Sequence, residues 1–202
     1  ASQGKEISYV LATRGEAGIA GMAPEKTGSL REEEERRSAA VVGVSRVEFL
    51  GYRDGEIEYG LALRRDLALA IRRLRPEIVI GMNFELTWGQ SGNVNHSDHR
   101  AVGLALLDAC RDAANEWVFT GDGEHWDGIT AIYVAGAASP THYVDVTETI
   151  DSGIASLREH RAYIEGLGTG FDPAEFLRST TTEAGEQAGC ELAVLFQAFN
   201  GG

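Results

Sequence analysis

Two histidines and an aspartate lie within four consecutive residues, at His96, Asp98 and His99, where a loop gives way to an apolar-periodic segment. Positions three apart share one face at the start of a helix, so both imidazoles can point the same way. A helix start also presents unpaired backbone N–H groups and a positive dipole end, which stabilise Asp98. An imidazole placed there is a natural metal ligand or a donor to a developing oxyanion. The alternative, idle surface histidines on a polar helix start, stays equally open from these residues alone.

Strands and helices that could position these residues alternate along the chain. Short apolar runs predict buried strands, and apolar residues at intervals of three and four predict helices. The strands are expected over 7–13, 47–52, 77–82, 129–134 and 143–146, and the helices over 30–43, 63–74 and 97–115. A further helix after Thr147 carries Ile150, Ile154, Leu157 and Ile164 on one stripe, a short helix spans 173–177, and 182–199 is partly helical at best.

Two of these helices have recognisable N-terminal signals. Ser29 and Glu32 have the spacing of a capping box, and Thr147 is an expected N-cap. The pairs Glu32–Arg36 and Glu33–Arg37 are in the favourable i, i+4 order.

The alternation predicts an α/β fold with a Rossmann-like, mostly parallel sheet flanked by helices in three layers. In such a sheet ligands bind beyond the carboxyl ends of the strands. Arg14 and Glu16 follow the first strand, Asp54 follows the second, and the segment with His96 and His99 follows the third. We therefore expect these polar groups to lie on one rim of the sheet.

Composition restricts the class of protein. The chain has 202 residues, which predicts a single domain over 1–202, and its hydrophobic content of 43% is enough for a core. The net charge of −13 disfavours nucleic acid and anionic membrane surfaces as partners and suits a cytoplasmic protein. Cys110 and Cys190 have no metal-type spacing, so free thiols are expected, and no apolar run approaches transmembrane length.

Four segments, in order, resemble the LmbE-like or PIG-L family of zinc-dependent N-acetylglucosamine deacetylases. They are Thr-Arg-Gly-Glu-Ala-Gly at 13–18, Leu-Arg-Glu-Glu-Glu at 30–34, Phe-Leu-Gly-Tyr-Arg-Asp-Gly at 49–55 and His-Ser-Asp-His-Arg-Ala-Val-Gly at 96–103. The resemblance implies a hydrolase that removes the acetyl group from an N-acetylglucosamine-type conjugate with zinc-activated water. The implied partner is a small amino-sugar conjugate; which acetylated substrate it is, and whether the chain forms a homo-oligomer, stay open.

The resemblance also implies roles for individual residues around the histidines. His99 matches the histidine ligand of Zn²⁺, and His96 matches a catalytic histidine that polarises the carbonyl or protonates the leaving amine. Asp98 matches the carboxylate that orients His96. Ser97 stands where the family usually has proline, and both residues suit a helix start.

Glu16, Arg31 and Asp54 match positions that hold the sugar or its surroundings. Without the resemblance, Arg31 reads as a helix-surface charge and Asp54 as a turn residue. His125 and His142 have no partner in the sequence and are interpreted as structural.

The family also has an N-terminal strand that ends in His-Pro-Asp-Asp, which supplies two further zinc ligands and the general base. This motif is not in the sequence, so we expect a segment carrying it, and the first strand of the sheet, to be missing from the chain. Catalytic zinc needs about three protein ligands and a water, and only His99 matches one.

Two other classes of function stay open. One is a non-catalytic sugar-binding or metal-free relic of the same fold. The other is a nucleotide-binding α/β protein, for which the glycine-rich stretch 166–170 is the only candidate. That stretch follows a helix and not a strand, so a plain loop is the better interpretation.

Overall fold

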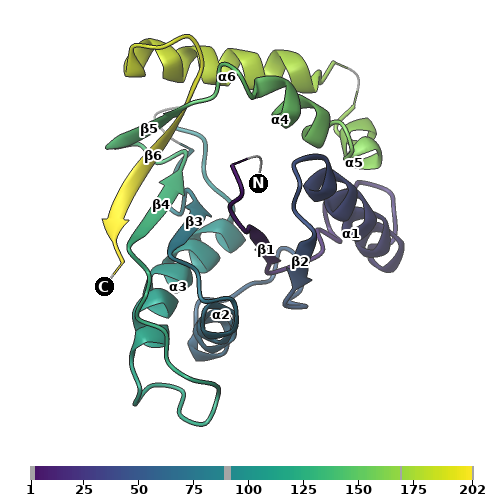
Figure 1. Cartoon of the computed structure of the whole chain (residues 1–202). Helices are drawn as coiled ribbons and strands as arrows, with labels where there is room; N and C mark the ends of the chain where they lie inside the picture. The colour runs from purple at the N-terminus through teal and green to yellow at the C-terminus, as the bar shows by residue number, and fades with distance from the viewer. Residues whose placement is uncertain (1–2, 89–91, 169, 202) are drawn as a thin grey trace. The chain divides into compact units, whose positions relative to one another are not determined.

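Strands and helices divide the chain into two compact units, one made of residues 1–54 with 144–194 and the other of 55–143 with 195–202. The structure is a computed structural model that describes residues 3–88, 92–168 and 170–201. The predicted α/β class is confirmed, because both units combine strands with flanking helices (Figure 1). The division does not test the expectation of a single domain over 1–202, which stays a prediction.

The first unit contains a two-stranded parallel sheet. β1 (Ser8–Leu11) pairs with β2 (Arg46–Phe49) from Ser8 opposite Arg46 to Leu11 opposite Phe49. α1 (Pro24–Val41) covers this pair, and Ala39 from the helix is buried with Val44 and Val47. Because the strands are parallel, the loops that follow them leave from the same end of the sheet.

Three more helices complete this unit. α4 (Ile150–Leu157) and α5 (Arg161–Gly166) pack against α1, and α6 (Pro173–Ala188) packs against α4. Ile150, Ile154 and Leu192 form a second buried cluster on this side.

The second unit is built around a four-stranded sheet of order β3-β4-β6-β5, the last two strands of which extend across the division. β3 (Ile78–Met82) and β4 (Ala131–Ala135) are parallel, whereas β6 (Ala193–Asn200) runs antiparallel to β4. β5 (His142–Asp145) is at the end of the order.

Two helices of the second unit pack against each other, α2 (Leu61–Leu74) and α3 (Ser97–Ala114). α2 buries Leu63, Leu67 and Ile71, while α3 buries a row of small residues that includes Ala105 and Ala109. Both helices match the ranges predicted from the apolar periodicity. In the part of the chain that the structure describes, no helix combines the length and apolarity that a membrane span requires.

Several helix ends differ from the predictions. α1 begins at Pro24, and Ser29 lies inside it with its Oγ donating to the Glu25 carbonyl at 3.1 Å, so the capping-box prediction was wrong. Proline at the first helical position pre-sets the helical φ and starts the helix earlier. Thr147 is not an N-cap either: α4 starts at Ile150, and the Thr147 hydroxyl accepts the Leu192 N–H at 3.2 Å. The predicted pairs Glu32–Arg36 and Glu33–Arg37 are present, at 2.8 and 3.7 Å.

The C-terminal third shows the largest differences. The helix after residue 147 ends at Leu157, so Ile164 lies in the separate α5. α6 has 16 residues in place of the short helix expected, and 193–200 forms β6. Gly185 suggested a weak helix, but a Cβ there would lie 2.5 Å from the Glu191 carbonyl oxygen, so glycine permits a close backbone approach. Gly189, with φ 80°, ends α6 in the left-handed conformation.

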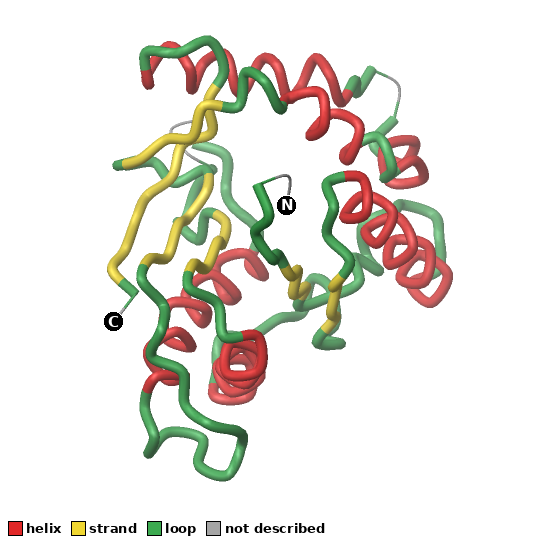
Figure 2. The backbone as a smooth tube through the Cα atoms, viewed as in Figure 1, coloured by secondary structure: helices red, strands yellow, loops and turns green. Residues whose placement is uncertain are grey.

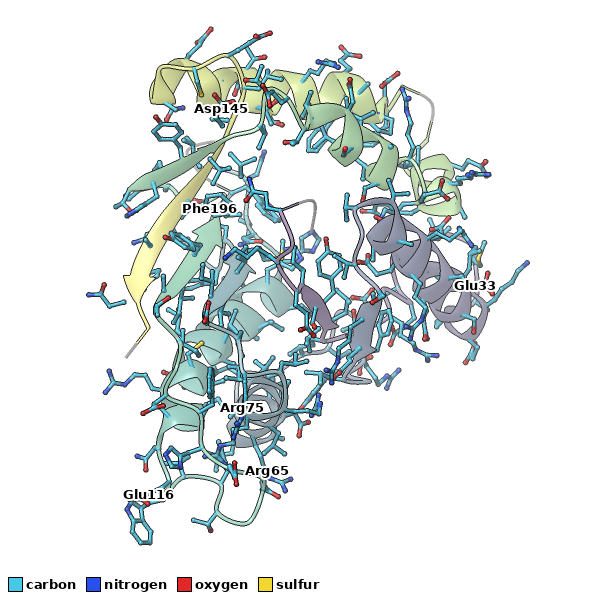
Figure 3. The ribbon with its side chains drawn as sticks, in the orientation of Figure 1. Glu33, Arg65, Arg75, Glu116, Asp145 and Phe196 are labelled. Carbon is cyan, nitrogen blue, oxygen red and sulfur yellow. The ribbon has the colours of Figure 1, made fainter. Side chains whose placement is uncertain are left out.

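A long loop follows α3 (Figure 2). Arginines of α2 and of its C-cap, Arg75, bind this loop. Arg72 is buried, and its guanidinium donates at 2.7–3.2 Å to the carbonyls of Asp112, Ala113, Asn115, Val118 and Phe119. Arg65 and Arg75, labelled in Figure 3, form ion pairs with Asp122 and Glu124 at 2.7 and 2.6 Å. Among the bonds described for these three arginines, those of Arg72 reach buried and partly buried backbone carbonyls, so the loop depends mainly on this residue.

Replacing Arg72 by methionine removes the donor shared by these carbonyls and keeps an apolar stem. We expect Arg72→Met to lower the free energy of unfolding by about 3 kcal/mol, because buried acceptors lose their partners. Arg65→Met, on the same helix, breaks only an exposed ion pair and should cost less than about 1 kcal/mol. Urea unfolding of both variants measures this difference, and equal losses would contradict the role given to Arg72.

Candidate active site

The two histidines singled out from the sequence lie together at the start of α3. His96 is the N-cap, with φ −61° and ψ 143°, and His99 follows in the first turn. Their ring centroids are 5.0 Å apart, and Trp88 meets the His99 ring edge-on at 5.2 Å. Trp88 is also 6.4 Å from the His96 ring. The expectation that the two imidazoles share one face is therefore met.

A buried asparagine that the sequence reasoning did not assign supports this pair. The side-chain oxygen of Asn95 is 3.0 Å from Nδ1 of His99 and accepts the His96 N–H at 2.8 Å. Its amide nitrogen donates to the carbonyls of Asn83 and Glu85, at 2.9 and 3.2 Å. The only sequence signal is an amide residue directly before a helix start that bears histidines.

Asp98 has different partners from the one predicted. It lies in the first turn of α3, and its carboxylate accepts the N–H groups of Gly55 and Ile57 at 2.7 and 3.2 Å. The Ser97 hydroxyl is a weaker neighbour at 3.4 Å. The carboxylate therefore fixes the backbone of 55–57 to the helix start, and the orientation of His96 by Asp98 stays a prediction.

In the first unit, Glu16 and Asp54 tie together the loops that follow β1 and β2. The Asp54 carboxylate accepts from the Thr13 hydroxyl at 3.2 Å and from the Ala17 N–H at 3.0 Å. The Glu16 carboxylate accepts the N–H groups of Asp54 and Arg14, at 3.2 and 3.1 Å. These residues thus lie at one end of the two-stranded sheet, and Asp54 does form the turn that its local sequence suggested. The histidine segment follows β3, which belongs to the other sheet, so the shared rim expected for all of these groups stays a prediction.

Arg31 is not the helix-surface charge that it resembles in isolation. Its side chain is 17% exposed, and Nη1 lies 3.1 Å from the Glu34 carboxylate and 2.9 Å from Nδ1 of His160. The guanidinium stacks 4.3 Å from the centre of the Tyr163 ring. Among the described residues, Nε of Arg31 is buried without a hydrogen-bond partner. The guanidinium is thus held by groups from α1, α5 and the turn before α5.

His160 is the second residue that sequence reasoning left without a role. Because a guanidinium only donates, Nδ1 of His160 must accept from Arg31, which places the proton on Nε2, 3.7 Å from the Glu35 carboxylate. Burial, followed by the positive charge of Arg31, holds the pKa of His160 below its ordinary value of 6.5. Burial also raises the pKa of the neighbouring Glu35 carboxyl.

A zinc site requires about three protein ligands. Within residues 3–88, 92–168 and 170–201, no group of three His, Cys, Asp or Glu side chains is placed to hold a metal ion. The His99 ring is oriented by the Asn95 oxygen, as metal-binding imidazoles commonly are by a second group, but the described residues do not form a complete zinc site. The two cysteines are free, as predicted, and burial raises the pKa of Cys110 to about 12.

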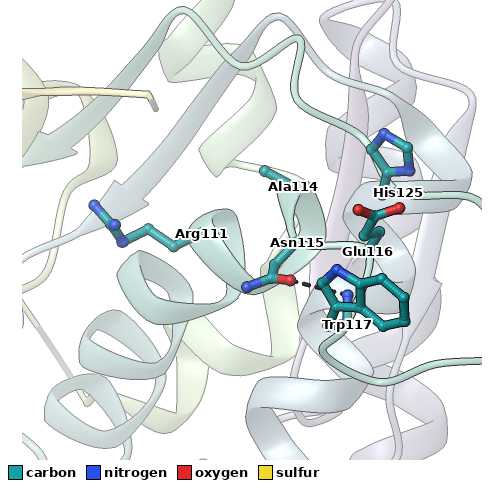
Figure 4. Close-up of a pocket in the computed structure, with 6 residues that line it drawn as sticks. All are labelled: Arg111, Ala114, Asn115, Glu116, Trp117 and His125. Carbon is teal, nitrogen blue, oxygen red and sulfur yellow. Dashed lines mark hydrogen bonds between the residues drawn. The ribbon is translucent and has the colours of Figure 1, made fainter.

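A pocket of about 460 Å³ lies at the opposite end of α3 (Figure 4). Its walls include Arg111, Asn115, Glu116, His125 and the 79% exposed Trp117. An 18-residue helix is about 27 Å long, so this pocket is far from the histidine pair at the helix start. It therefore belongs to the loop held by Arg72 and not to the candidate active site.

The lowered pKa of His160 predicts a pH-dependent stability. In the unfolded chain this ring takes a proton near pH 6.5, whereas in the folded protein it does so only at lower pH, so folding loses free energy as the pH falls below about 6.5. His160→Gln keeps an acceptor for Arg31 and does not titrate. We expect the stability advantage of the wild type over His160→Gln to be constant above pH 7.5 and to shrink towards pH 5. Urea unfolding at several pH values measures it; a difference independent of pH would contradict the assigned protonation state.

The partners of Asp98 predict a structural cost for its replacement. Asp98→Asn presents an amide nitrogen to one of two backbone donors, so we expect a loss of about 2 kcal/mol in the free energy of unfolding. Asp108→Asn, at a half-buried position of the same helix, keeps an oxygen that can accept from the Tyr59 hydroxyl and should cost less than about 1 kcal/mol. Thermal and urea unfolding give both values, and a neutral Asp98→Asn would show that the bonds to 55–57 contribute little.

Comparison with known proteins places this arrangement in a family. Diacetylchitobiose deacetylase of Thermococcus kodakarensis is 25% identical over 198 residues, covering 94% of this chain and 71% of that protein. A Bacillus anthracis protein named as a probable N-acetyl-α-D-glucosaminyl L-malate deacetylase 2 is 32% identical over 110 residues, 51% of this chain and 46% of its own length. The solved N,N'-diacetylchitobiose deacetylase of Pyrococcus horikoshii shares the fold, with a TM-score of 0.86 at 24% identity over 99% of this chain and 75% of its own.

The segments with Arg31, Asp54 and the histidine pair all fall within the part of the chain that a family comparison identifies. Residues 1–110 match the family described as PIG-L, GlcNAc-PI de-N-acetylase. The resemblance inferred from the four sequence segments is thereby confirmed, and the chain belongs to the PIG-L family.

Proposed function

We propose that this protein is a hydrolase that removes the acetyl group from an N-acetylglucosamine-type conjugate. The observation that carries the proposal is the pair of adjacent imidazoles at the start of α3, one of them held by a buried amide, in a chain of the PIG-L family. Two neighbouring imidazoles can divide the work of amide hydrolysis, one positioning an electrophile and the other moving protons.

The relatives support the substrate class. One is named for the deacetylation of diacetylchitobiose and the other for that of N-acetyl-α-D-glucosaminyl L-malate. The group that these two substrates share is a 2-acetamido sugar, whereas the group attached to the sugar differs. An N-acetylglucosamine unit is therefore the part of the substrate that we propose for this chain.

The reaction is the addition of water to the acetamide carbonyl, followed by cleavage of the C–N bond to give acetate and the free amine. We propose that His96 donates a hydrogen bond to the developing oxyanion or protonates the departing amine, because its ring adjoins His99 at an exposed helix start. In this proposal Asp98 acts on His96 through the shape of the helix start, since its carboxylate binds the backbone of 55–57.

Glu16, Arg31 and Asp54 are proposed to bind the sugar. Their carboxylates and guanidinium are fixed by neighbouring groups, and sugar hydroxyls can donate to the former and accept from the latter. Fixed polar groups recognise a hydroxyl at a small entropic cost, because they are already ordered before binding.

We propose zinc as the cofactor, with His99 as one of its ligands. When bound, zinc polarises the amide carbonyl and lowers the pKa of a coordinated water to about 7. The proposal rests on the oriented ring of His99 and on family membership. A cytoplasmic location, suggested by the net charge of −13, stays a prediction.

Paired variants test the proposal. We expect His96→Ala to keep bound zinc and to lower kcat by about 10²–10⁴-fold, because it removes the oxyanion hydrogen bond or the proton donor but no proposed zinc ligand. His99→Ala should lose zinc and activity together, and His125→Ala, at the far end of α3, should change neither. Acetate release from N,N'-diacetylchitobiose and from N-acetylglucosaminyl malate, with metal analysis of each variant, supplies the data.

Three results would count against this assignment. Full zinc occupancy in His99→Ala would remove that residue from the metal site, and an unchanged rate in His96→Ala would remove that residue from the mechanism. Binding of the sugars without release of acetate would favour the non-catalytic sugar-binding alternative.

A further inference from the structure

The side-chain amide of Asn95 can adopt only one orientation. Its nitrogen end faces two backbone carbonyls, those of Asn83 at 2.9 Å and Glu85 at 3.2 Å. Carbonyl oxygens accept hydrogen bonds and never donate, so the NH₂ group must point at them and the oxygen must point the other way. A flipped amide would place its oxygen against two acceptors in a position that is only 2% exposed, where water cannot compensate.

The orientation of this amide decides which nitrogen of His99 carries the proton. The Asn95 oxygen accepts the backbone N–H of His96 at 2.8 Å and lies 3.0 Å from Nδ1 of His99. Because an amide oxygen only accepts, Nδ1 must be the donor, and a neutral ring then carries its lone pair on Nε2. We infer that Asn95 is a positioning residue that fixes His99 in the Nδ1–H tautomer.

The surroundings of Asn95 make this constraint rigid. Asn83 is fully buried, and its amide donates to the carbonyls of Thr87 and Gly136 at 3.0 and 2.9 Å while its oxygen accepts the Glu85 N–H at 2.7 Å. The two carbonyls that orient Asn95 therefore belong to a backbone segment that is itself held. The Asn95 carbonyl in turn accepts from the Arg100 guanidinium of α3. The amide thus connects the end of β3 to the first turn of α3.

The consequence for the site rests on the proposed function. A metal binds the lone pair of a neutral imidazole, and a hydrogen bond to the other ring nitrogen fixes that lone pair in direction and raises its basicity. Partners of this kind typically change metal affinity by about 10- to 100-fold when they are removed. In this chain the side-chain oxygen of Asn95, the residue before the N-cap His96, takes that place for His99.

The tautomer can be measured directly in the wild-type chain. With ¹⁵N-labelled imidazoles, two-bond ¹H–¹⁵N correlation spectra distinguish a protonated from an unprotonated ring nitrogen, and His99→Gln assigns the signals. At a pH where the ring is neutral, we expect Nδ1 of His99 to be protonated and Nε2 to be unprotonated. A wild-type spectrum with the proton on Nε2 would overturn the inference whatever the variants do.

Three variants separate positioning from general stability. Asn95→Leu removes the acceptor at nearly constant volume and should release the ring to a mixture of tautomers. Asn95→Asp keeps an acceptor oxygen at Nδ1 of His99 but turns its other oxygen towards the carbonyls of Asn83 and Glu85, so we expect a less stable protein in which Nδ1 is still protonated. Asn83→Ala weakens the same backbone segment without touching His99 and should also keep it. An unchanged pattern in Asn95→Leu, or a loss of the pattern in Asn95→Asp, would contradict the role of the amide.

Zinc affinity, measured by competition with a chromophoric chelator, tells this inference apart from the proposed function. We expect Zn²⁺ to bind about 10- to 100-fold more weakly to Asn95→Leu than to the wild type, and within a few-fold of wild type to Asn95→Asp. A wild-type chain that shows the Nδ1–H tautomer but binds no Zn²⁺ would refute zinc ligation by His99 and leave the positioning by Asn95 intact. Tight Zn²⁺ binding by a chain whose His99 carries its proton on Nε2 would refute the positioning by Asn95 and leave zinc ligation by His99 intact.

Discussion

The candidate active site depends on one constraint, the requirement that a buried amide satisfy both of its ends. Asn95 meets it by donating to the backbone after β3 and accepting from the first turn of α3. Since neither end can be served by water, the strand exit and the helix start must keep a fixed relation. The positions of His96 and His99 depend on this fixed relation. Asn95, to which we assign no role in the reaction itself, therefore sets the geometry of the pair.

In the first unit, charged side chains are also held in place by groups from other parts of the chain. The carboxylates of Glu16 and Asp54 bind backbone N–H groups of each other's loops, and Arg31 is held between Glu34 and His160. Apart from the Arg31–Glu34 pair within α1, each contact joins parts of the chain that are distant in sequence. Side chains proposed to meet a substrate are thus ordered beforehand, which reduces the entropy lost on binding. A buried Arg–Glu–His cluster is a costly way to gain stability, and its better-supported use is to fix geometry.

Local patterns predicted the elements wherever a single periodicity dominated. The apolar stripe of 63–74 and the run of 77–82 gave α2 and β3 nearly to the residue. The predictions failed where tertiary contacts decided the outcome. Gly185 weakens an isolated helix, yet it lies in α6 because a neighbouring backbone approaches it too closely for a side chain. Ser29 had the right spacing for a cap, but Pro24 had already started the helix.

The sequence by itself determined the α/β class, the family and the identity of the candidate residues, because these follow from periodicity and from four short segments in order. It left unassigned the roles of Asn95 and His160, and it gave Asp98 a partner that the structure does not show. Only the tertiary structure decided which groups face each other across the loops, and hence which ring nitrogen of His99 carries a proton. The physical reason is that hydrogen-bond direction depends on pairs of groups far apart in the chain, which no local pattern specifies.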